Sequence, residues 1–108
     1  MKAAVLGEKA VEIRDVATPA AKANELLVKV RAAALNRADV VMAASQAPGF
    51  APGFVLGGEC AGEVVAVGGD VTGFKPGDRV AGTAHGSFAE YVAMDAGRAY
   101  RMQATDMS

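Results

Sequence analysis

The stretch that decides the fold runs from Leu56 to Val80 and reads LGGECAGEVVAVGGDVTGFKPGDRV. Its first glycines, Gly57, Gly58 and Gly62, leave the backbone free to adopt positive φ or to let another group approach closely. The β-branched run EVVAV that follows predicts a short strand. A helix would not contain so many glycines. We therefore expect β-structure with a shaped loop at one end.

A tight turn closes this stretch at Lys75-Pro76-Gly77-Asp78. Proline presets φ at the second position of a turn, and Gly77 can take the positive φ that a type II turn requires at the third. The turn leads into a strand that starts at Arg79. Gly77 and Asp78 are therefore predicted to be structural residues.

The rest of the chain predicts more short strands. They fall at 2–6, 11–16, 26–32 (continuing toward residue 36), 63–67, 88–94 and 99–102. The alternation of apolar and charged residues over 11–16 predicts a half-buried strand. Asn36 is a good N-cap for a brief helix over 37–44, with Asp39 in its first turn. We expect a mainly β fold, a partly open β-barrel with one or two short helices, as one domain over residues 1–108.

Bulk composition excludes several classes of function. The chain has 108 residues, of which 52% are hydrophobic, and a formal net charge of -1, so neither nucleic acid nor an anionic membrane is an expected partner. Cys60 is the single cysteine, which excludes an internal disulfide and a cysteine-rich zinc site. No apolar run reaches the ~18 residues of a spanning helix. We expect a cytoplasmic protein.

The segments LGGECAGEVVAVG and VTGFKPGDRV resemble the N-terminal half of the medium-chain dehydrogenase/reductase superfamily. More narrowly, they are similar to its zinc-independent quinone oxidoreductases and enoyl reductases. The resemblance covers the whole chain and implies a GroES-like barrel. In this superfamily a Rossmann domain follows and binds NAD(P), but no glycine fingerprint opening a helix is present here.

The resemblance therefore implies a fragment of a longer enzyme. We expect its own Rossmann domain to bind most of the cofactor, NADPH, and the isolated chain to be inactive. Without that domain, the strand 88–94 and the loop 50–54 are expected to bare an apolar face through which the fragment self-associates. The implied substrate is a small quinone or enone, reduced by hydride transfer.

Two positions argue against zinc. Zinc-dependent members of the superfamily have cysteine where this chain has Asn36, and histidine in the motif that reads Gly57-Gly58-Glu59 here. Neither a carboxamide nor a glycine supplies the ligands that zinc requires. The resemblance therefore implies an enzyme without metal.

The resemblance also suggests a role for Asn36, whose amide would hydrogen-bond the cofactor or the substrate near the site of hydride transfer. The alternative is that Asn36 only caps the helix. Phe50 and Phe54 either line an apolar substrate entrance or pack their loop on the barrel. The Glu59 carboxylate is expected to accept hydrogen bonds from backbone amides and so to hold the loop that contains Gly57 and Gly58, the glycine loop. Cys60 is expected to be a small apolar filler, His85 a surface residue.

Two other classes of function stay open. A stand-alone GroES-like binding or co-chaperonin module would share this fold, since fold alone does not determine function. A catalytically silent family member acting as an interaction protein is the second. Similar quinone oxidoreductases carry tyrosines where this chain has Val40, Val41, Met42 and Ala47, which leaves the proton donor unassigned.

Overall fold

The computed structural model describes residues 1–6, 11–34, 55 and 57–102. Its elements, in chain order, are β1 (Lys2–Leu6), β2 (Val11–Asp15), β3 (Glu25–Ala34), β4 (Glu59–Val67), β5 (Arg79–Thr83), β6 (Tyr91–Asp95), the short 3₁₀ helix η1 (Ala96–Arg98) and β7 (Ala99–Arg101). The prediction of a mainly β fold is confirmed. The predicted helix over 37–44 lies outside the described residues.

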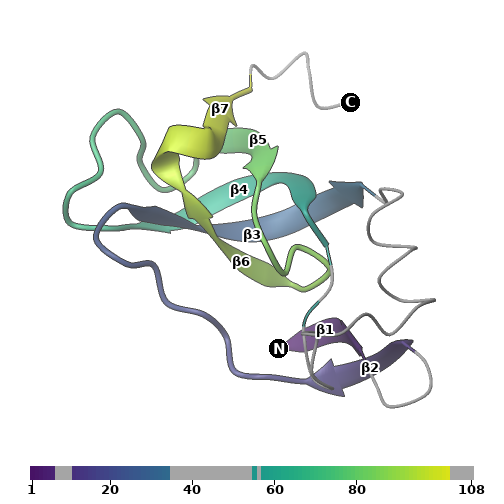
Figure 1. Ribbon diagram of the computed structural model, residues 1–108. Helices are drawn as coiled ribbons and strands as arrows, with labels where there is room; N and C mark the ends of the chain where they lie inside the picture. The colour runs from purple at the N-terminus through teal and green to yellow at the C-terminus, as the bar shows by residue number, and fades with distance from the viewer. Residues whose placement is uncertain (7–10, 35–54, 56, 103–108) are drawn as a thin grey trace.

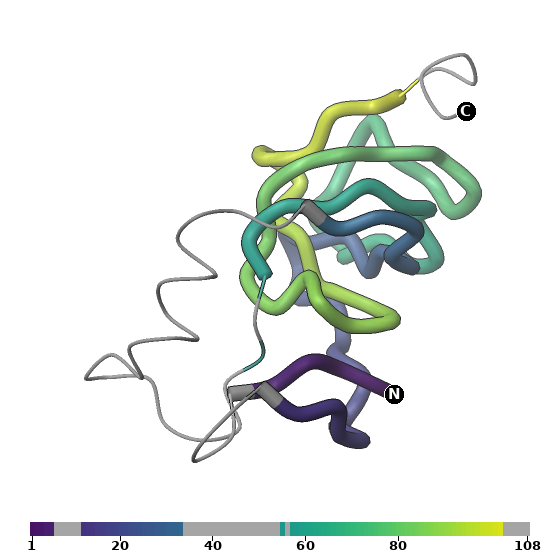
Figure 2. The backbone as a smooth tube through the Cα atoms, turned by 90° about the vertical axis from the view of Figure 1, so that its right-hand side faces the viewer, coloured from purple at the N-terminus to yellow at the C-terminus, as the bar shows by residue number. Residues whose placement is uncertain are grey.

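The strands form two antiparallel sheets. One contains β1 and β2, and the other has the order β6-β3-β4-β5-β7. Isolated bridges from Ala3 to Ala89 and from Val5 to Val55 connect β1 to the rest of the chain. Figure 1 shows the β1–β2 hairpin beneath the larger sheet, and the view turned by 90° in Figure 2 shows the same two layers. The sheets are therefore not closed into a complete barrel.

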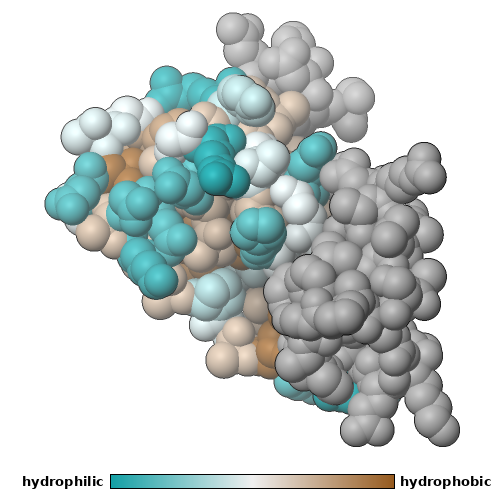
Figure 3. All heavy atoms as spheres, viewed as in Figure 1, coloured by the Kyte–Doolittle hydropathy of each residue, from teal (hydrophilic) through white to brown (hydrophobic). Residues whose placement is uncertain are grey.

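The core lies on the inner face of the five-stranded sheet. Buried apolar side chains alternate along its strands, as the two-residue period of a strand requires. They include Leu26, Val28, Val64, Val80, Val92 and Met94. On the face turned to the viewer in Figure 3, polar and apolar side chains are interspersed.

Two bulges between β3 and β4 change the predicted faces of these strands. The register shifts between Leu27 and Val28 and again between Val30 and Ala32. Because a bulge inserts one unpaired residue, the side chains beyond it exchange faces. Strict alternation over 26–32 would place Ala32 on the same face as Val28, but Ala32 is exposed, whereas Val28 is buried.

The strand predicted over 63–67 starts earlier, at Glu59, because Gly62 is part of the ladder. A Cβ at Gly62 would lie 2.1 Å from the carbonyl oxygen of Lys29 on the neighbouring strand. A glycine inside a strand often marks such a close approach of two backbones. Gly62 therefore permits tight pairing of β3 with β4 instead of interrupting the strand.

Two further predictions need correction. The strand predicted over 88–94 begins at Tyr91, because residues 88–90 turn toward β1, although the Glu90 carbonyl still accepts from the amide of Val30 in β3 at 2.9 Å. The amide of Ala4 donates to the carbonyl of Phe88 at 2.7 Å, and the amide of Glu90 donates to that of Lys2 at 3.1 Å. The strand predicted to be half-buried over 11–16 is β2, whose residues 12–15 are all exposed.

Candidate functional site

Three strand ends meet at one edge of the larger sheet. Ala34, the last residue of β3, pairs with Glu59 at the start of β4, and Glu59 pairs with Thr83 at the end of β5. The chain reaches Asn36 two residues after Ala34. The glycine motif and the strand that leads to Asn36 therefore belong to the same edge.

The backbone of Gly57 packs directly against the loop that contains Gly86, Ser87 and Phe88. Gly57 adopts φ +108°, a conformation that L side chains rarely adopt. A Cβ at Gly57 would lie 2.5 Å from the hydroxyl oxygen of Ser87 and 2.6 Å from the amide nitrogen of Phe88. The amide of Gly86 donates to the Gly57 carbonyl at 3.0 Å. Only glycine can bring these two loops together.

Gly58 differs from its neighbour. Its φ is not in the left-handed region, and a Cβ built on it would meet nothing within 4 Å. Its carbonyl accepts a hydrogen bond from the amide of Ala84 at 2.9 Å. Among the described residues, packing therefore leaves room for a side chain at this position.

Glu59 contributes to the loop through its main chain. Its carbonyl accepts a hydrogen bond from the Ser87 hydroxyl at 3.2 Å, and Ser87 is fully buried. The side chain of Glu59 is exposed, and its carboxylate has no hydrogen bond to another described residue. The predicted anchoring by that carboxylate stays a prediction.

A depression of about 470 Å³ opens beside these strand ends. Its lining combines small residues with a few polar groups: Ala32, Ala33, Glu59, Cys60, Ala61, Ala81, Gly82, Thr83 and Tyr100. Pockets that bind small molecules are commonly apolar with a small number of polar groups at fixed places. The depression has this character, and its polar residues Thr83 and Glu59 pair with each other at the strand ends next to Gly58.

Cys60 also borders the depression but is buried, with 6% of its surface exposed. Burial raises the pKa of its thiol from 9.0 to about 11, because desolvation disfavours the thiolate. A thiol that stays protonated is a poor nucleophile. The prediction that Cys60 is an apolar filler is confirmed, and His85 is exposed as predicted.

The turn at residues 75–78 forms as predicted. Gly77 has φ +97°, and the amide of Asp78 donates to the carbonyl of Lys75 at 3.1 Å. The Asp78 carboxylate accepts from the amide of Lys75 at 3.0 Å. This turn leads into β5 and has a structural role, away from the edge where Glu59 lies.

Several predicted site residues lie outside the described residues, namely Asn36, Asp39, Phe50 and Phe54. The structure brings together Gly57, Gly58, Glu59 and the end of β3. Sequence reasoning missed the structural role of Ser87; the available signal was its place directly after Gly86, in a loop between two predicted strands. Within the described ranges, no three histidine, cysteine or acidic side chains cluster as metal ligands, and no helix is long and apolar enough to cross a membrane.

Two curated relatives of this chain are reductases. The chain is 44% identical over 82 residues to an acryloyl-coenzyme A reductase from Metallosphaera sedula, covering 74% of this chain and 25% of the relative. It is 43% identical over 91 residues to the trans-enoyl reductase RAP2 from Pyricularia oryzae, covering 76% of this chain and 25% of the relative. The chain therefore spans about a quarter of the length of these relatives.

Two solved structures superpose closely on this chain. A mycobacterial quinone oxidoreductase superposes with a TM-score of 0.85 at 31% identity, covering 96% of this chain and 34% of that one. A mycobacterial protein complexed with NADPH superposes with a TM-score of 0.86 at 31% identity, covering 100% and 35%. The predicted resemblance to the medium-chain dehydrogenase/reductase superfamily is confirmed.

The family profile of the alcohol dehydrogenase GroES-like domain matches residues 22–104. This span runs from the turn before β3 to just beyond β7 and so contains the whole five-stranded sheet. It also contains the glycine loop and the turn at residues 75–78. The chain belongs to the alcohol dehydrogenase GroES-like domain family.

Proposed function

We propose that this chain is the substrate-side part of an NADPH-dependent, zinc-independent oxidoreductase that reduces quinones or α,β-unsaturated carbonyl compounds. The observation that carries the proposal is the similarity to reductases at 44% and 43% identity, together with the edge where the glycine loop meets the end of β3. A cytoplasmic location is part of the same proposal. The longer enzyme would supply its own Rossmann domain.

The described residues do not fit the phosphates of a dinucleotide. Their glycines with positive φ are Gly57, Gly73, Gly77 and Gly86, and none of them lies between a strand and the N-terminus of a long helix, as a phosphate-binding turn requires. NADPH, when bound elsewhere in the longer protein, supplies the hydride. This chain would supply one wall of the substrate site.

The residues of that wall suit a neutral, weakly polar substrate. Ala32, Ala61 and Ala81 give the depression an apolar floor without bulk, and excluding water from such a surface strengthens the few polar contacts it makes. Thr83 can donate a hydrogen bond to a substrate oxygen at the rim. Asn36, two residues beyond the end of β3, would add an amide donor.

The residue types at two positions support the proposal of a mechanism without zinc. Gly58 has space around it, so packing does not explain why this position lacks the histidine of zinc-dependent relatives. Asn36 replaces their cysteine. A chain that retained the motif but lost both ligands is suited to reactions in which no metal polarises the substrate.

The test is an assay of the full-length protein. Loss of NADPH absorbance is followed with a quinone and with an α,β-unsaturated ketone as electron acceptors, and an alcohol with NADP⁺ serves as the comparison. We expect NADPH oxidation with at least one acceptor class and no reduction of NADP⁺ by the alcohol. Alcohol oxidation without reduction of either acceptor would contradict the proposal.

A further inference from the structure

We propose that the outer edge of β2 is an interface through which two copies of this chain pair, with their β2 strands antiparallel around a two-fold axis at Ile13. The second copy would extend the β1–β2 hairpin into a four-stranded sheet. β2 lies at the margin of the molecule with β1 between it and the larger sheet (Figure 1). Among the described residues, β2 pairs with β1 alone.

The hydrogen bonds of β1 reveal which groups of β2 face outward. Ala4 donates its amide to Phe88, so its polar groups point away from β2. Ala4 is opposite Ile13. Because such pairs alternate along an antiparallel ladder, the N–H and C=O of Ile13 point away from β1.

The same alternation applies at both ends of the strand. Lys2 accepts from the amide of Glu90 and is opposite Asp15, so Asp15 also presents its N–H and C=O outward. The ladder places Val11 in the same phase. Val11, Ile13 and Asp15 therefore offer three evenly spaced donor–acceptor sets at the edge of β2 that no described strand covers.

These sets match a second copy of themselves. If Ile13 pairs with Ile13 of the second copy, Val11 is opposite Asp15 in both directions. Each of these pairs can exchange both of its hydrogen bonds, and no other register centred on β2 uses all three. The strand length and the alternation thus fix both the axis and the register.

Charge complementarity selects a second copy as the occupant. In this register Glu12 lies opposite Arg14 of the other chain, and Arg14 opposite Glu12. Pairs without backbone hydrogen bonds bring side chains closest together, and these are such pairs. Within one chain the Arg14 Nε already donates to the Glu12 carboxylate at 2.6 Å, so both charges lie on the same face.

Ile13 gives the interface its apolar part. Its side chain is 70% exposed, the highest exposure of an aliphatic side chain among the large exposed hydrophobics described. It borders a groove that also contains Ala4, Val30 and Phe88. Side-by-side packing of two Ile13 side chains across the axis would remove apolar surface from water on the face opposite Glu12 and Arg14.

Charged residues on an edge strand usually prevent pairing. Here the two signs alternate so that they attract across the two-fold axis. The paired strands are short, which places the interface below the roughly 1,000 Å² of a tight complex. We therefore expect a weak, reversible dimer.

Charge reversal and charge exchange test this register by sedimentation velocity over a concentration series of the 108-residue chain. Glu12→Arg places like charges opposite each other twice, and the dimer dissociation constant should rise about tenfold or more. Glu12→Arg combined with Arg14→Glu restores attraction and should restore the wild-type constant. A wild-type chain that stays monomeric, a single variant that still dimerises normally or a double variant that does not recover would each overturn the proposal.

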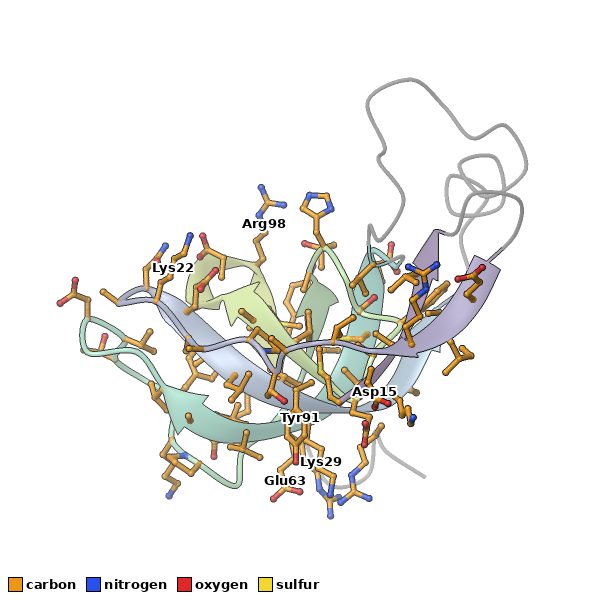
Figure 4. The ribbon with its side chains drawn as sticks, turned by 90° about the horizontal axis from the view of Figure 1, so that it is seen from below. Asp15, Lys22, Lys29, Glu63, Tyr91 and Arg98 are labelled. Atoms are coloured by element: carbon orange, nitrogen blue, oxygen red, sulfur yellow. The ribbon has the colours of Figure 1, made fainter. Side chains whose placement is uncertain are left out.

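Cross-linking gives an independent measurement. In the proposed register the Cα atoms at position 13 lie about 5.5 Å apart, within reach of a disulfide. Ile13→Cys should therefore give a covalent dimer under mild oxidation. Lys22→Cys, exposed on another segment (Figure 4), is the matched control and should not. Equal cross-linking of both variants would exclude this interface, and circular dichroism verifies that each variant is folded.

Discussion

Gly57 and Gly58 are neighbours, but there is no room for a side chain at Gly57 and ample room for one at Gly58. A Cβ at Gly57 would overlap the amide of Phe88 at 2.6 Å, in a backbone conformation with φ +108°. We expect Gly57→Ala to lower the free energy of unfolding by more than about 2 kcal/mol, because left-handed strain alone costs roughly 1–2 kcal/mol. Denaturant unfolding followed by circular dichroism measures the change.

Gly58→Ala is the matched control. Its surroundings are open and its φ is ordinary, so alanine should be neutral or should stabilise the fold by up to about 1 kcal/mol through the unfolded state. Equal losses from the two variants would show that the loop does not depend on the φ of Gly57.

Cys60 gives the fold a dependence on alkaline pH. Burial raises the pKa of its thiol from 9.0 to about 11, so between these values the unfolded chain has lost a proton that the folded chain keeps. The stability contribution is complete below pH 9 and is lost as pH rises toward 11. The denaturation midpoint of the wild type should fall more steeply over this interval than that of Cys60→Ala. Parallel curves would show that Cys60 does not titrate differently in the two states.

A substitution at Asn36 in the full-length protein distinguishes a catalytic role of this residue from a helix-capping role. Asn36→Asp keeps a side chain that caps helices as well as asparagine does, but it removes the N–H donor and adds a charge. If the amide positions substrate or cofactor, the fall in kcat/KM should correspond to the ~2–4 kcal/mol of transition-state stabilisation typical of one hydrogen bond. The free energy of unfolding should not change. A stable variant with near-normal kcat/KM would leave Asn36 as a cap only.

The sequence correctly predicted features that depend on a residue's type and its immediate neighbours in the chain. Proline followed by glycine determined the turn at Gly77, and the single cysteine proved to be a buried filler. Ser87 was missed because its role depends on Gly57 and Glu59, about 30 residues earlier. Contacts between loops so far apart in sequence leave no periodic signal.

At the scale of elements, β7 is fastened to the turn before β5 by Arg101. Its guanidinium donates to the Gly73 carbonyl, lies 3.4 Å from the Asp78 carboxylate and stands 5.6 Å from the centroid of the Phe74 ring. Because these contacts are partly exposed, each contributes at most about 1 kcal/mol to the free energy of unfolding.

We expect Arg101→Ala to destabilise the fold by about 1 kcal/mol. Arg101→Lys should recover only part of the loss, because lysine lacks the planar fork that reaches several partners. Arg98→Ala, which removes an exposed arginine in η1 (Figure 4), is the control and should change stability by less than about 0.5 kcal/mol. Thermal unfolding of the three variants compares them; indistinguishable losses for Arg101→Ala and Arg98→Ala would show that this contact set is not specific.

Strand existence was easier to predict than strand boundaries. β-branched runs and turn residues located β3, β4, β5 and β7 to within a few residues. The two bulges between β3 and β4 could not be predicted, because they depend on how these strands pair. The exposure of β2 was missed for a similar reason: its alternation fits a half-buried strand, but no described layer covers the face that carries Ile13.

At the scale of the whole molecule, the match over residues 22–104 agrees with the motif that the sequence already displayed. The length of the relatives, about four times the span matched here, supports the proposal that cofactor binding resides elsewhere in a longer protein. Titration of the 108-residue chain with micromolar NADPH should therefore give no saturable change in nucleotide fluorescence. Micromolar affinity would place the nucleotide site within this chain.

The dependence of full-length activity on metal tests the proposed function most directly. The measurement is kcat/KM for NADPH-dependent reduction of a quinone or enone before and after exhaustive chelation, with zinc content determined on the same untagged samples. Because Asn36 and Gly58 cannot replace cysteine and histidine as ligands, we predict an unchanged kcat/KM and no stoichiometric zinc. Loss of activity on chelation, with recovery on adding zinc, would contradict the zinc-independent mechanism.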